Sequence, residues 1–321
     1  MCTAISLGRF CGRNLDIEVT FKEEVIITPR KYPIKFKSER ASYEHFAFIG
    51  IGIRESGYPL YFDAANEHGL YIAGLNYVGN AKYHKISDGK INLAPYELIP
   101  YLLSRYKSVS EVRCVLEQIN LISVPFSDAL PLSELHFFIA DKNEAITVEP
   151  DSHGLSIYDN HVGVLANNPP FPYQLHNLSN YAGLSNGPLV NRFAPQLKLL
   201  EYSKGMGALG LPGDLSSESR FVRAAFHRQN LKNCTTPCDF FHILSSVEMP
   251  KGSLKLGELF EYTEYSAAVD LESIDYFFRT YDSYSITRIG LQDSNLYSDS
   301  INVYPMHKAN ATPKVKRIDI S

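Results

Sequence analysis

The residue with the most distinctive chemistry in this sequence is Cys2, which directly follows the initiator methionine. Methionine before a small residue is normally removed, so Cys2 is expected to become the first residue and to carry a thiol and a free α-amine together. An α-amine titrates at about 7.7 to 8 and a cysteine thiol at about 8.5, so the amine can accept the thiol proton at little cost. Cys2 therefore has the groups of a nucleophile with its own base, although on its own it equally suits the first position of a buried strand.

Two charged residues in the segment GRNLD, Arg13 and Asp16, have the types that would activate such a cysteine. A guanidinium near the sulfur favours the thiolate, and a carboxylate can orient the α-amine and stabilise its protonated form. Short strands joined by a turn could bring both residues beside Cys2. A surface ion pair is the alternative, because the spacing of the two residues is only mildly specific.

Two other motifs are present in weaker contexts. The glycines of GMGALG, at Gly205, Gly207 and Gly210, match a dinucleotide fingerprint, but Pro212 and Gly213 block the helix that must follow it. The segment GLSNG around Ser185 matches a nucleophile elbow without its strand-turn-helix setting. A nucleotide-binding protein that uses NAD or FAD, and a serine nucleophile at Ser185, therefore remain as alternatives.

Composition excludes several classes of function. The chain has 321 residues, 45% of them hydrophobic, and a net charge of −4 without any Lys/Arg run. This predicts a globular protein whose partner is neither nucleic acid nor an anionic membrane surface. The apolar stretches are only strand-length and no leader pattern is present, which indicates a cytoplasmic protein. Five scattered cysteines indicate reduced thiols, and no Cys/His spacing predicts a metal site.

The hydrophobic periodicity predicts strands, two helices, strands, two helices and strands again. This order, without repeats or linkers, predicts one α+β domain over residues 1–321 in which helices cover two antiparallel sheets. Gly12 and Arg13 are expected in a turn, and residues 167–215 in a long loop. The predicted strands are 3–7, 14–20, 24–28, 47–53, 70–76, 136–140, 145–149, 155–158, 162–166, 259–269, 276–281, 285–291 and 301–304, and the predicted helices are 95–105, 108–119, 217–229 and one beginning at 236.

Eight collinear segments together resemble one known family. They are MCTAISL, GRNLD, YPLYFDAANEHGL, AGLNY, PLSELHFFIAD, VLANNPPF, GLPGDLSSESRFVRAAF and FFHILSSVEMPKG. In order and spacing they are similar to the choloylglycine hydrolases, the bile salt hydrolase and penicillin V acylase group of N-terminal-nucleophile hydrolases. The resemblance runs from residue 1 to about residue 306 and implies a four-layer αββα fold.

The resemblance also assigns roles to matched positions. It implies that Cys2 is the nucleophile and base, with Arg13 near its sulfur and Asp16 near its amine. Asn76 and Asn167 would donate to the oxyanion, and Arg220 would support the charge network of the nucleophile. These types suit the roles, because amide donors stabilise developing negative charge without titrating. The structural alternatives are core asparagines and a helix-surface arginine.

The implied reaction is hydrolysis of a linear amide, most simply of bile salts conjugated to glycine or taurine, without metal or cofactor. Asn76 favours this branch, since the penicillin acylases of the family often have Tyr there. Acylases of penicillin V or of N-acyl homoserine lactones, and a catalytically silent ligand-binding relative, are the alternatives. The resemblance further implies a homo-oligomer, a tetramer. The expected pocket residues are Leu15, Phe62, Phe126, Leu130 and Leu135, although departures from the family at Phe137, at Ala166 and in YTEYSAAVD affect the pocket's shape.

Overall fold

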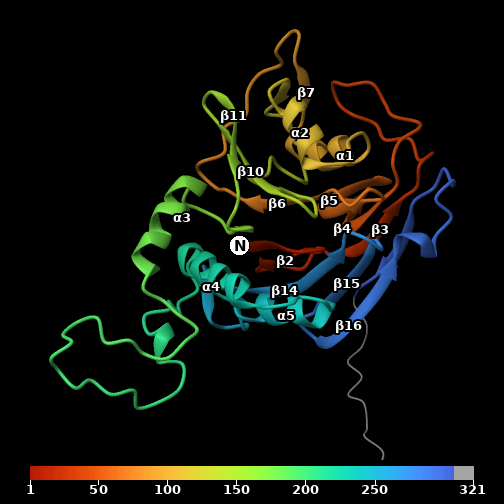
Figure 1. Ribbon diagram of the computed structural model, residues 1–321. Coiled ribbons are helices and arrows are strands. Elements are labelled where there is room, and N and C mark those ends of the chain that lie inside the picture. Colours follow the sequence, from red (N-terminus) through yellow and green to blue (C-terminus); the bar gives the residue numbers. More distant parts are fainter. Residues whose placement is uncertain (307–321) are drawn as a thin grey trace, which may run out of the picture.

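The protein contains two large antiparallel sheets (Figure 1), seen in a computed structural model that describes residues 1–306. The first sheet has the order β12-β1-β2-β14-β15-β16, with β13 pairing on β14. Its strands are β1 (Cys2–Leu7), β2 (Phe10–Ile17), β12 (Val164–Leu165), β13 (Leu254–Leu256), β14 (Leu259–Asp270), β15 (Asp275–Thr280) and β16 (Ser283–Gly290). The first strand of the chain therefore lies inside this sheet, between β12 and β2.

The second sheet has eight strands in the order β11-β10-β9-β6-β5-β4-β3-β17. Its strands are β3 (Glu24–Thr28), β4 (Phe48–Glu55), β5 (Tyr58–Asn66), β6 (Tyr71–Asn76), β9 (Leu135–Ala140), β10 (Ala145–Asp151), β11 (Gly154–Asp159) and β17 (Asn302–Pro305). A short parallel pair, β7 (Ile91–Leu93) and β8 (Ile119–Leu121), lies outside both sheets.

Helices cover the outer face of each sheet (Figure 1). The helices α1 (Leu98–Leu103) and α2 (Val109–Leu116) lie over the eight-stranded sheet, and α4 (Ser217–Asn230) and α5 (Pro237–Ser245) over the seven-stranded one. A fifth helix, α3 (Phe171–Leu178), packs beside α4, where Phe171 meets Phe221. The result is the four-layer αββα arrangement predicted from the resemblance.

The helix starts follow capping chemistry that can be read in the sequence. The Ser108 hydroxyl accepts the backbone N–H of Glu111 at the start of α2, and Thr236 with Asp239 forms a capping box at the start of α5. Both starts confirm the predictions. Each cap replaces a hydrogen-bond partner that the first turn of a helix lacks.

Several predictions of local structure were wrong, and the short strands β7, β8 and β13 were not predicted. Gly12 and Arg13 lie within β2, because the turn between the first two strands is at Gly8 and Arg9. Strand β5 was not predicted, since burial on both faces removes the polar alternation that marks a strand. Helix α3 interrupts the predicted long loop, and it begins after two prolines with no side-chain cap. The single-domain prediction extends to residue 321, and residues 307–321 lie outside the described part.

Each sheet carries a β-bulge near its centre. In β5, Asp63 pairs with Ile51 and Tyr61 pairs with Gly52, which leaves Phe62 as the extra residue. In β14, the pairing with β2 shifts by one residue between Thr263 and Tyr265. Bulges redirect side chains and free backbone groups from the ladder, and they are frequent beside active sites.

Candidate active site

Cys2 opens β1 and is almost fully buried, yet it lines a cavity of about 410 Å3 that strands of both sheets enclose together with loop residues 124–133. The guanidinium of Arg13 lies next to it, with Nη2 at 2.5 Å from the cysteine Sγ. Strand pairing explains this neighbourhood, because Ala4 of β1 faces Arg13 of β2 in the antiparallel register. A donor of fixed positive charge at the sulfur stabilises the thiolate form.

Arg13 is fully buried and is held by the opposite sheet. Its Nη1 donates to the carbonyl of Phe62 at 3.0 Å and to that of Gly74 at 2.7 Å. The Phe62 carbonyl belongs to the bulged residue of β5, so the bulge contributes one wall of this arginine socket. The predicted alternative, a surface ion pair with Asp16, is therefore wrong.

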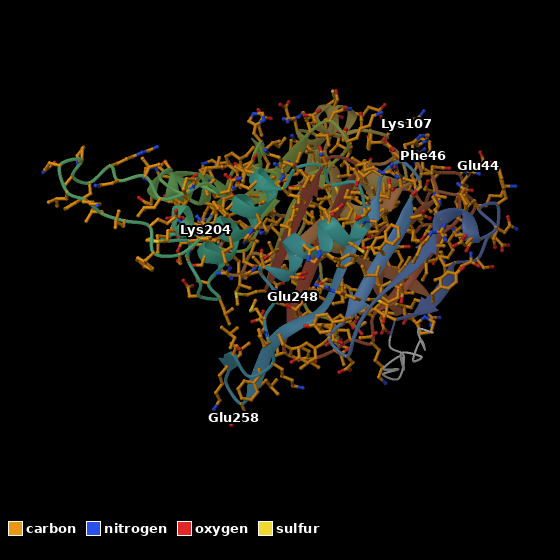
Figure 2. The ribbon with its side chains drawn as sticks, turned by 60° about the horizontal axis from the view of Figure 1, so that its bottom comes forward. Glu44, Phe46, Lys107, Lys204, Glu248 and Glu258 are labelled. Atoms are coloured by element: carbon orange, nitrogen blue, oxygen red, sulfur yellow. The ribbon has the colours of Figure 1, made fainter. Side chains whose placement is uncertain are left out.

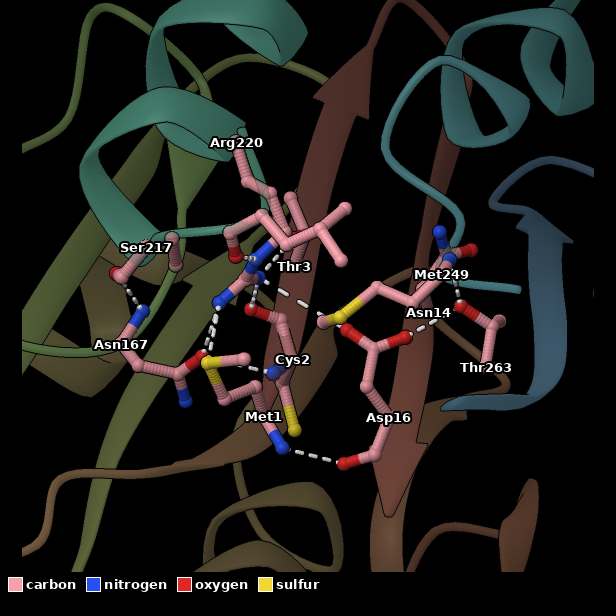
Figure 3. Close-up of polar contacts among 12 residues, drawn as sticks. Met1, Cys2, Thr3, Asn14, Asp16, Asn167, Ser217, Arg220, Met249 and Thr263 are labelled. Carbon is pink, nitrogen blue, oxygen red and sulfur yellow. Dashed lines mark hydrogen bonds and ion pairs between the residues drawn. The ribbon is translucent and has the colours of Figure 1, made fainter. Parts of the chain in front are cut away.

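Asn167 and Arg220 hold the backbone of Cys2 (Figure 3). The backbone nitrogen of Cys2 donates to Oδ1 of Asn167 at 2.8 Å, and Arg220 donates to the Cys2 carbonyl at 2.6 Å. Arg220 also donates to Oδ1 of Asn167 at 2.8 Å and to the hydroxyl of Thr3 at 2.6 Å. Since Arg220 is fully buried, it is not the helix-surface arginine that was the alternative.

Asp16 is a fully buried carboxylate with one occupied and one open oxygen. Its Oδ1 accepts the hydroxyl of Thr263 at 2.6 Å, whereas Oδ2 has no hydrogen-bond donor among the described residues and lies 3.8 Å from Nη1 of Arg220. Burial raises the pKa of Asp16, and Arg220 opposes that shift. Leaving a buried carboxylate oxygen without a hydrogen-bond donor costs free energy, so Oδ2 of Asp16 is suited to accept an additional N–H.

Met1 occupies the space in front of Cys2 (Figure 3). Its α-amine donates to the carbonyl of Asp16 and forms an ion pair with the buried Glu261, while its sulfur lies 3.3 Å from Arg220. Burial lowers the pKa of the Met1 amine. With Met1 attached, the nitrogen of Cys2 is an amide and cannot take up a proton.

Asn76 ends β6 at the rim of the cavity and is exposed there. Its backbone carbonyl accepts Nδ2 of Asn167 at 2.8 Å, so the two asparagines predicted as oxyanion donors lie side by side. Because an amide nitrogen has two hydrogens, Nδ2 of Asn167 retains one for a ligand.

The five predicted pocket residues all line the cavity that contains Cys2. Further apolar side chains that the sequence did not mark line the same cavity, and Arg13 and Glu18 are the only charged residues in its lining as far as the structure describes it. The apolar members comprise the predicted Leu15, Phe62, Phe126, Leu130 and Leu135, together with Ile17, Val19, Phe21, Ile53, Leu60, Val124, Ala129 and Leu132. The cavity thus combines an extended apolar wall with one reactive polar end.

The alternative sites lie elsewhere. Gly205 precedes only one turn of 3-10 helix, so the glycine-rich segment is a loop rather than a dinucleotide fold. The hydroxyl of Ser185 accepts the backbone N–H of Gly187. Burial raises the pKa of the Cys11 thiol, which makes it a poor nucleophile.

Sequence reasoning missed several residues that support the site. The Ser217 hydroxyl accepts the backbone N–H of Asn167 at 2.8 Å, which fixes the segment before α3 to the start of α4. Thr3, Thr263 and Glu261 complete the polar surroundings of Cys2 and Met1. Ser217 lies inside one of the segments that carry the family resemblance, which was the available signal for it.

Comparison with known sequences identifies the family of the chain. Residues 2–304 match the family described as linear amide C–N hydrolases, choloylglycine hydrolase family. A bile salt hydrolase/transferase of Lactiplantibacillus plantarum is 48% identical over 95% of this chain and 97% of its own length. A bile salt hydrolase/transferase of Clostridium perfringens is 34% identical over 96% of this chain and 98% of its own.

Solved structures give the same result. The crystal structure of a conjugated bile acid hydrolase from Clostridium perfringens, in a cysteine-to-alanine variant, has a TM-score of 0.92 at 32% identity and covers 98% of this chain and 100% of that one. A penicillin V acylase from Agrobacterium tumefaciens shares the fold, with a TM-score of 0.75 at 17% identity, over 97% of this chain and 94% of that one.

The architecture is therefore that of the N-terminal-nucleophile hydrolases. Within that class, the chain belongs to the choloylglycine hydrolase family of linear amide C–N hydrolases. No helix among residues 1–306 has the length and hydropathy to cross a membrane, and the same residues contain no His/Cys/Asp/Glu cluster that would hold a metal ion.

Proposed function

We propose that this protein hydrolyses the amide bond of bile salts conjugated to glycine or taurine, with Cys2 as nucleophile. The observation that carries the proposal is the Cys2 thiol beside Arg13 at the polar end of a large apolar cavity. An amphipathic steroid fits such a cavity, since its apolar body meets apolar side chains while its amide reaches the thiol. Relatives from two bacteria that are named bile salt hydrolase/transferase support this substrate class.

The reaction follows from the groups around Cys2. The Cys2 thiolate attacks the amide carbonyl carbon, and the free α-amine of Cys2, protonated by the thiol, gives its proton to the departing nitrogen as the C–N bond breaks. The released amine is glycine or taurine, and the acyl group remains as a thioester on Cys2. Water then attacks the thioester carbonyl, and one proton of the water passes to the α-amine. The bond between the acyl carbon and the Cys2 sulfur breaks, so the bile acid leaves and Cys2 returns to the thiolate.

The neighbouring residues supply position and charge. Arg13 stabilises the thiolate, and the open Oδ2 of Asp16 accepts an N–H of the α-ammonium. Oδ1 of Asn167 orients the same nitrogen. The amide nitrogens of Asn76 and Asn167 are proposed to donate to the oxyanion as charge develops there.

A parallel assay tests the substrate class. With glycocholate, taurocholate, penicillin V and an N-acyl homoserine lactone at equal concentrations, we expect kcat/KM for a conjugated bile salt to exceed that for the other two by at least about tenfold, which corresponds to about 1.4 kcal/mol. The apolar wall of the cavity is the reason, because a steroid buries more apolar area there than a phenoxyacetyl group. Faster turnover of penicillin V or of the lactone would contradict the proposed substrate class and favour that compound instead. Absence of turnover, with bile salt still bound, would favour a silent relative.

The mature chain is expected to begin at Cys2. Met1 blocks the α-nitrogen of Cys2, whereas its removal leaves a free amine that Oδ1 of Asn167 holds, with the open oxygen of Asp16 proposed as a second acceptor. Intact mass spectrometry of an active preparation should therefore show a chain lighter by one methionine. A fully active preparation that retains Met1 throughout would refute the role of the α-amine.

We further infer that the protein is a cytoplasmic homo-oligomer, a tetramer by resemblance to its family, and that the chain forms one domain. A segment between α3 and α4 that extends from the body supports the oligomer (Figure 1), because it exposes Phe193, Leu200 and Tyr202 to solvent. A second projection, the β13–β14 hairpin, has Glu258 at its tip (Figure 2). Sedimentation in dilute buffer tests the oligomeric state.

A further inference from the structure

A second buried carboxylate, Asp63, lies behind the active site and takes no part in the proposed steps. It is fully buried on β5, directly after the bulged Phe62. Three tyrosine hydroxyls donate to its two oxygens: Tyr71 at 3.1 Å, Tyr265 at 3.2 Å, and Tyr276. Since Tyr71 comes from the same sheet as Asp63 and the other two come from the opposite sheet, the cluster joins both sheets.

The number of donors indicates the charge of Asp63. A carboxylate only accepts hydrogen bonds, whereas a protonated carboxyl must use one oxygen as a donor. Three hydroxyl groups directed at two oxygens favour the ionised, acceptor-only form. Burial raises the pKa of Asp63, and Arg13 and the three hydroxyls oppose this shift.

Arg13 is the cation that faces Asp63. Its hydrogen bonds go to Sγ of Cys2 and to the carbonyls of Phe62, Gly74 and Asn14, so Asp63 acts on it through charge rather than through a hydrogen bond. Arg13 owes part of its stabilisation as a cation to the charges of Cys2 and Asp63. Arg13 thus lies between the Cys2 thiol and a buried carboxyl group whose three hydroxyl donors favour its ionised form.

The two buried arginines and two buried aspartates form matched pairs around Cys2. Arg220 faces Asp16 and Arg13 faces Asp63, and β14 gives a hydroxyl to each acid, from Thr263 and from Tyr265 on either side of its bulge. With both aspartates ionised and Cys2 neutral, the charges of these four residues sum to zero.

We propose that Asp63 is a positioning residue that compensates the charge of Arg13 and thereby limits how strongly Arg13 stabilises the Cys2 thiolate. The inference rests on the proposed function only in taking Cys2 as the nucleophile. An overstabilised thiolate attacks poorly, because nucleophilicity falls as the thiol becomes more acidic. Asp63 and its three tyrosines would therefore keep the thiol reactive while Arg13 stays in place.

The other ionisable groups near this cluster are few. Arg220 and the N-terminal amine face both Cys2 and Asp16, Glu23 lies close enough to affect Tyr265, and Cys11 lies close enough to affect Tyr71. The test must therefore change Asp63 while leaving these groups as they are.

The test is the pH dependence of Cys2 alkylation by iodoacetamide, followed by peptide mass spectrometry in the protein without substrate. In Asp63→Asn the pH midpoint for Cys2 should fall by about one unit, because Arg13 loses its counter-charge. The exposed Cys114 in the same sample is the internal control, and its midpoint should not move. An unchanged or raised midpoint for Cys2 would overturn the proposal, and neither outcome depends on which amide the enzyme cleaves.

Two further variants keep the test decisive. Tyr71→Phe combined with Tyr276→Phe removes both donors to Oδ2 of Asp63, which favours the protonated carboxyl and should lower the Cys2 midpoint in the same direction. Asp141→Asn removes a different buried carboxylate, which accepts three backbone N–H groups and lines a separate cavity. It should lower the melting temperature without moving the Cys2 midpoint. A Cys2 midpoint that falls equally in Asp141→Asn would contradict the role of Asp63. If Asp63→Asn does not fold, an unchanged Cys2 midpoint in the double tyrosine variant would contradict it.

Discussion

Replacing Cys2 by alanine is expected to abolish amide hydrolysis while leaving the fold and bile-salt binding nearly unchanged. Among the described residues that line the cavity, Cys2 contributes the only sulfur, and alanine exchanges one small side chain for another in β1. Without a nucleophile only weak catalysis by binding and oxyanion donors remains, so the rate should fall by at least about 10^4-fold. Steady-state kinetics, a melting curve and bile-salt binding on one sample measure all three quantities.

The remaining cysteines provide matched controls for that result. Alanine at Cys11, Cys114, Cys234 or Cys238 should retain activity, because none of them lines the cavity with Cys2. If Cys2→Ala still hydrolyses the substrate, the nucleophile lies elsewhere and Ser185 becomes the next residue to test.

Replacing Asn167 by alanine is expected to lower kcat much more than it raises KM. The amide holds the Cys2 nitrogen through Oδ1, and Nδ2 is proposed to donate to the oxyanion. Loss of one oxyanion donor typically costs roughly a hundredfold to a thousandfold in rate, about 2.7 to 4 kcal/mol, because the donor acts on charge that develops in the transition state. Misplacement of the α-amine adds to this loss.

Asn66 is the control for a purely structural asparagine. It is fully buried, donates to the carbonyls of Leu103 and Tyr106, and does not line the cavity that contains Cys2. Asn66→Ala should lower the melting temperature with little change in kcat of the folded enzyme. If Asn167→Ala behaves in the same way, or if unfolding accounts for its whole rate loss, Asn167 is not part of the catalytic site.

The sequence predicted much of the fold because its signals are local. Caps at Ser108 and Thr236 marked two helix starts, and short alternating segments marked many of the strands. Strand β5 escaped prediction because both of its faces are buried, and the bulge at Phe62 depends on pairing with β4. Helix α3 has no side-chain cap, so tertiary packing against α4 decides its position.

The candidate site shows the same division. Cys2, Arg13 and Asp16 lie close together in sequence, and their chemistry could be read from residue types. The cluster of Asp63 and its three tyrosines could not be predicted, because two of the hydrogen bonds to this carboxylate form only when the two sheets pack against each other. The same is true of two further features, which arise only in the folded chain. They are the Asp16 oxygen without a hydrogen-bond donor and the hydrogen bond from the Cys2 nitrogen to Asn167.

The most direct test of the central claim is to trap the acyl-enzyme. The protein is mixed with glycocholate, quenched in acid within milliseconds to seconds, and examined by intact and peptide mass spectrometry. The account predicts a chain without Met1 that gains the mass of one cholyl group, bound as a thioester at Cys2 and lost on hydroxylamine treatment. A cholyl adduct on any other residue, or turnover with the adduct on a chain that still begins at Met1, would contradict it.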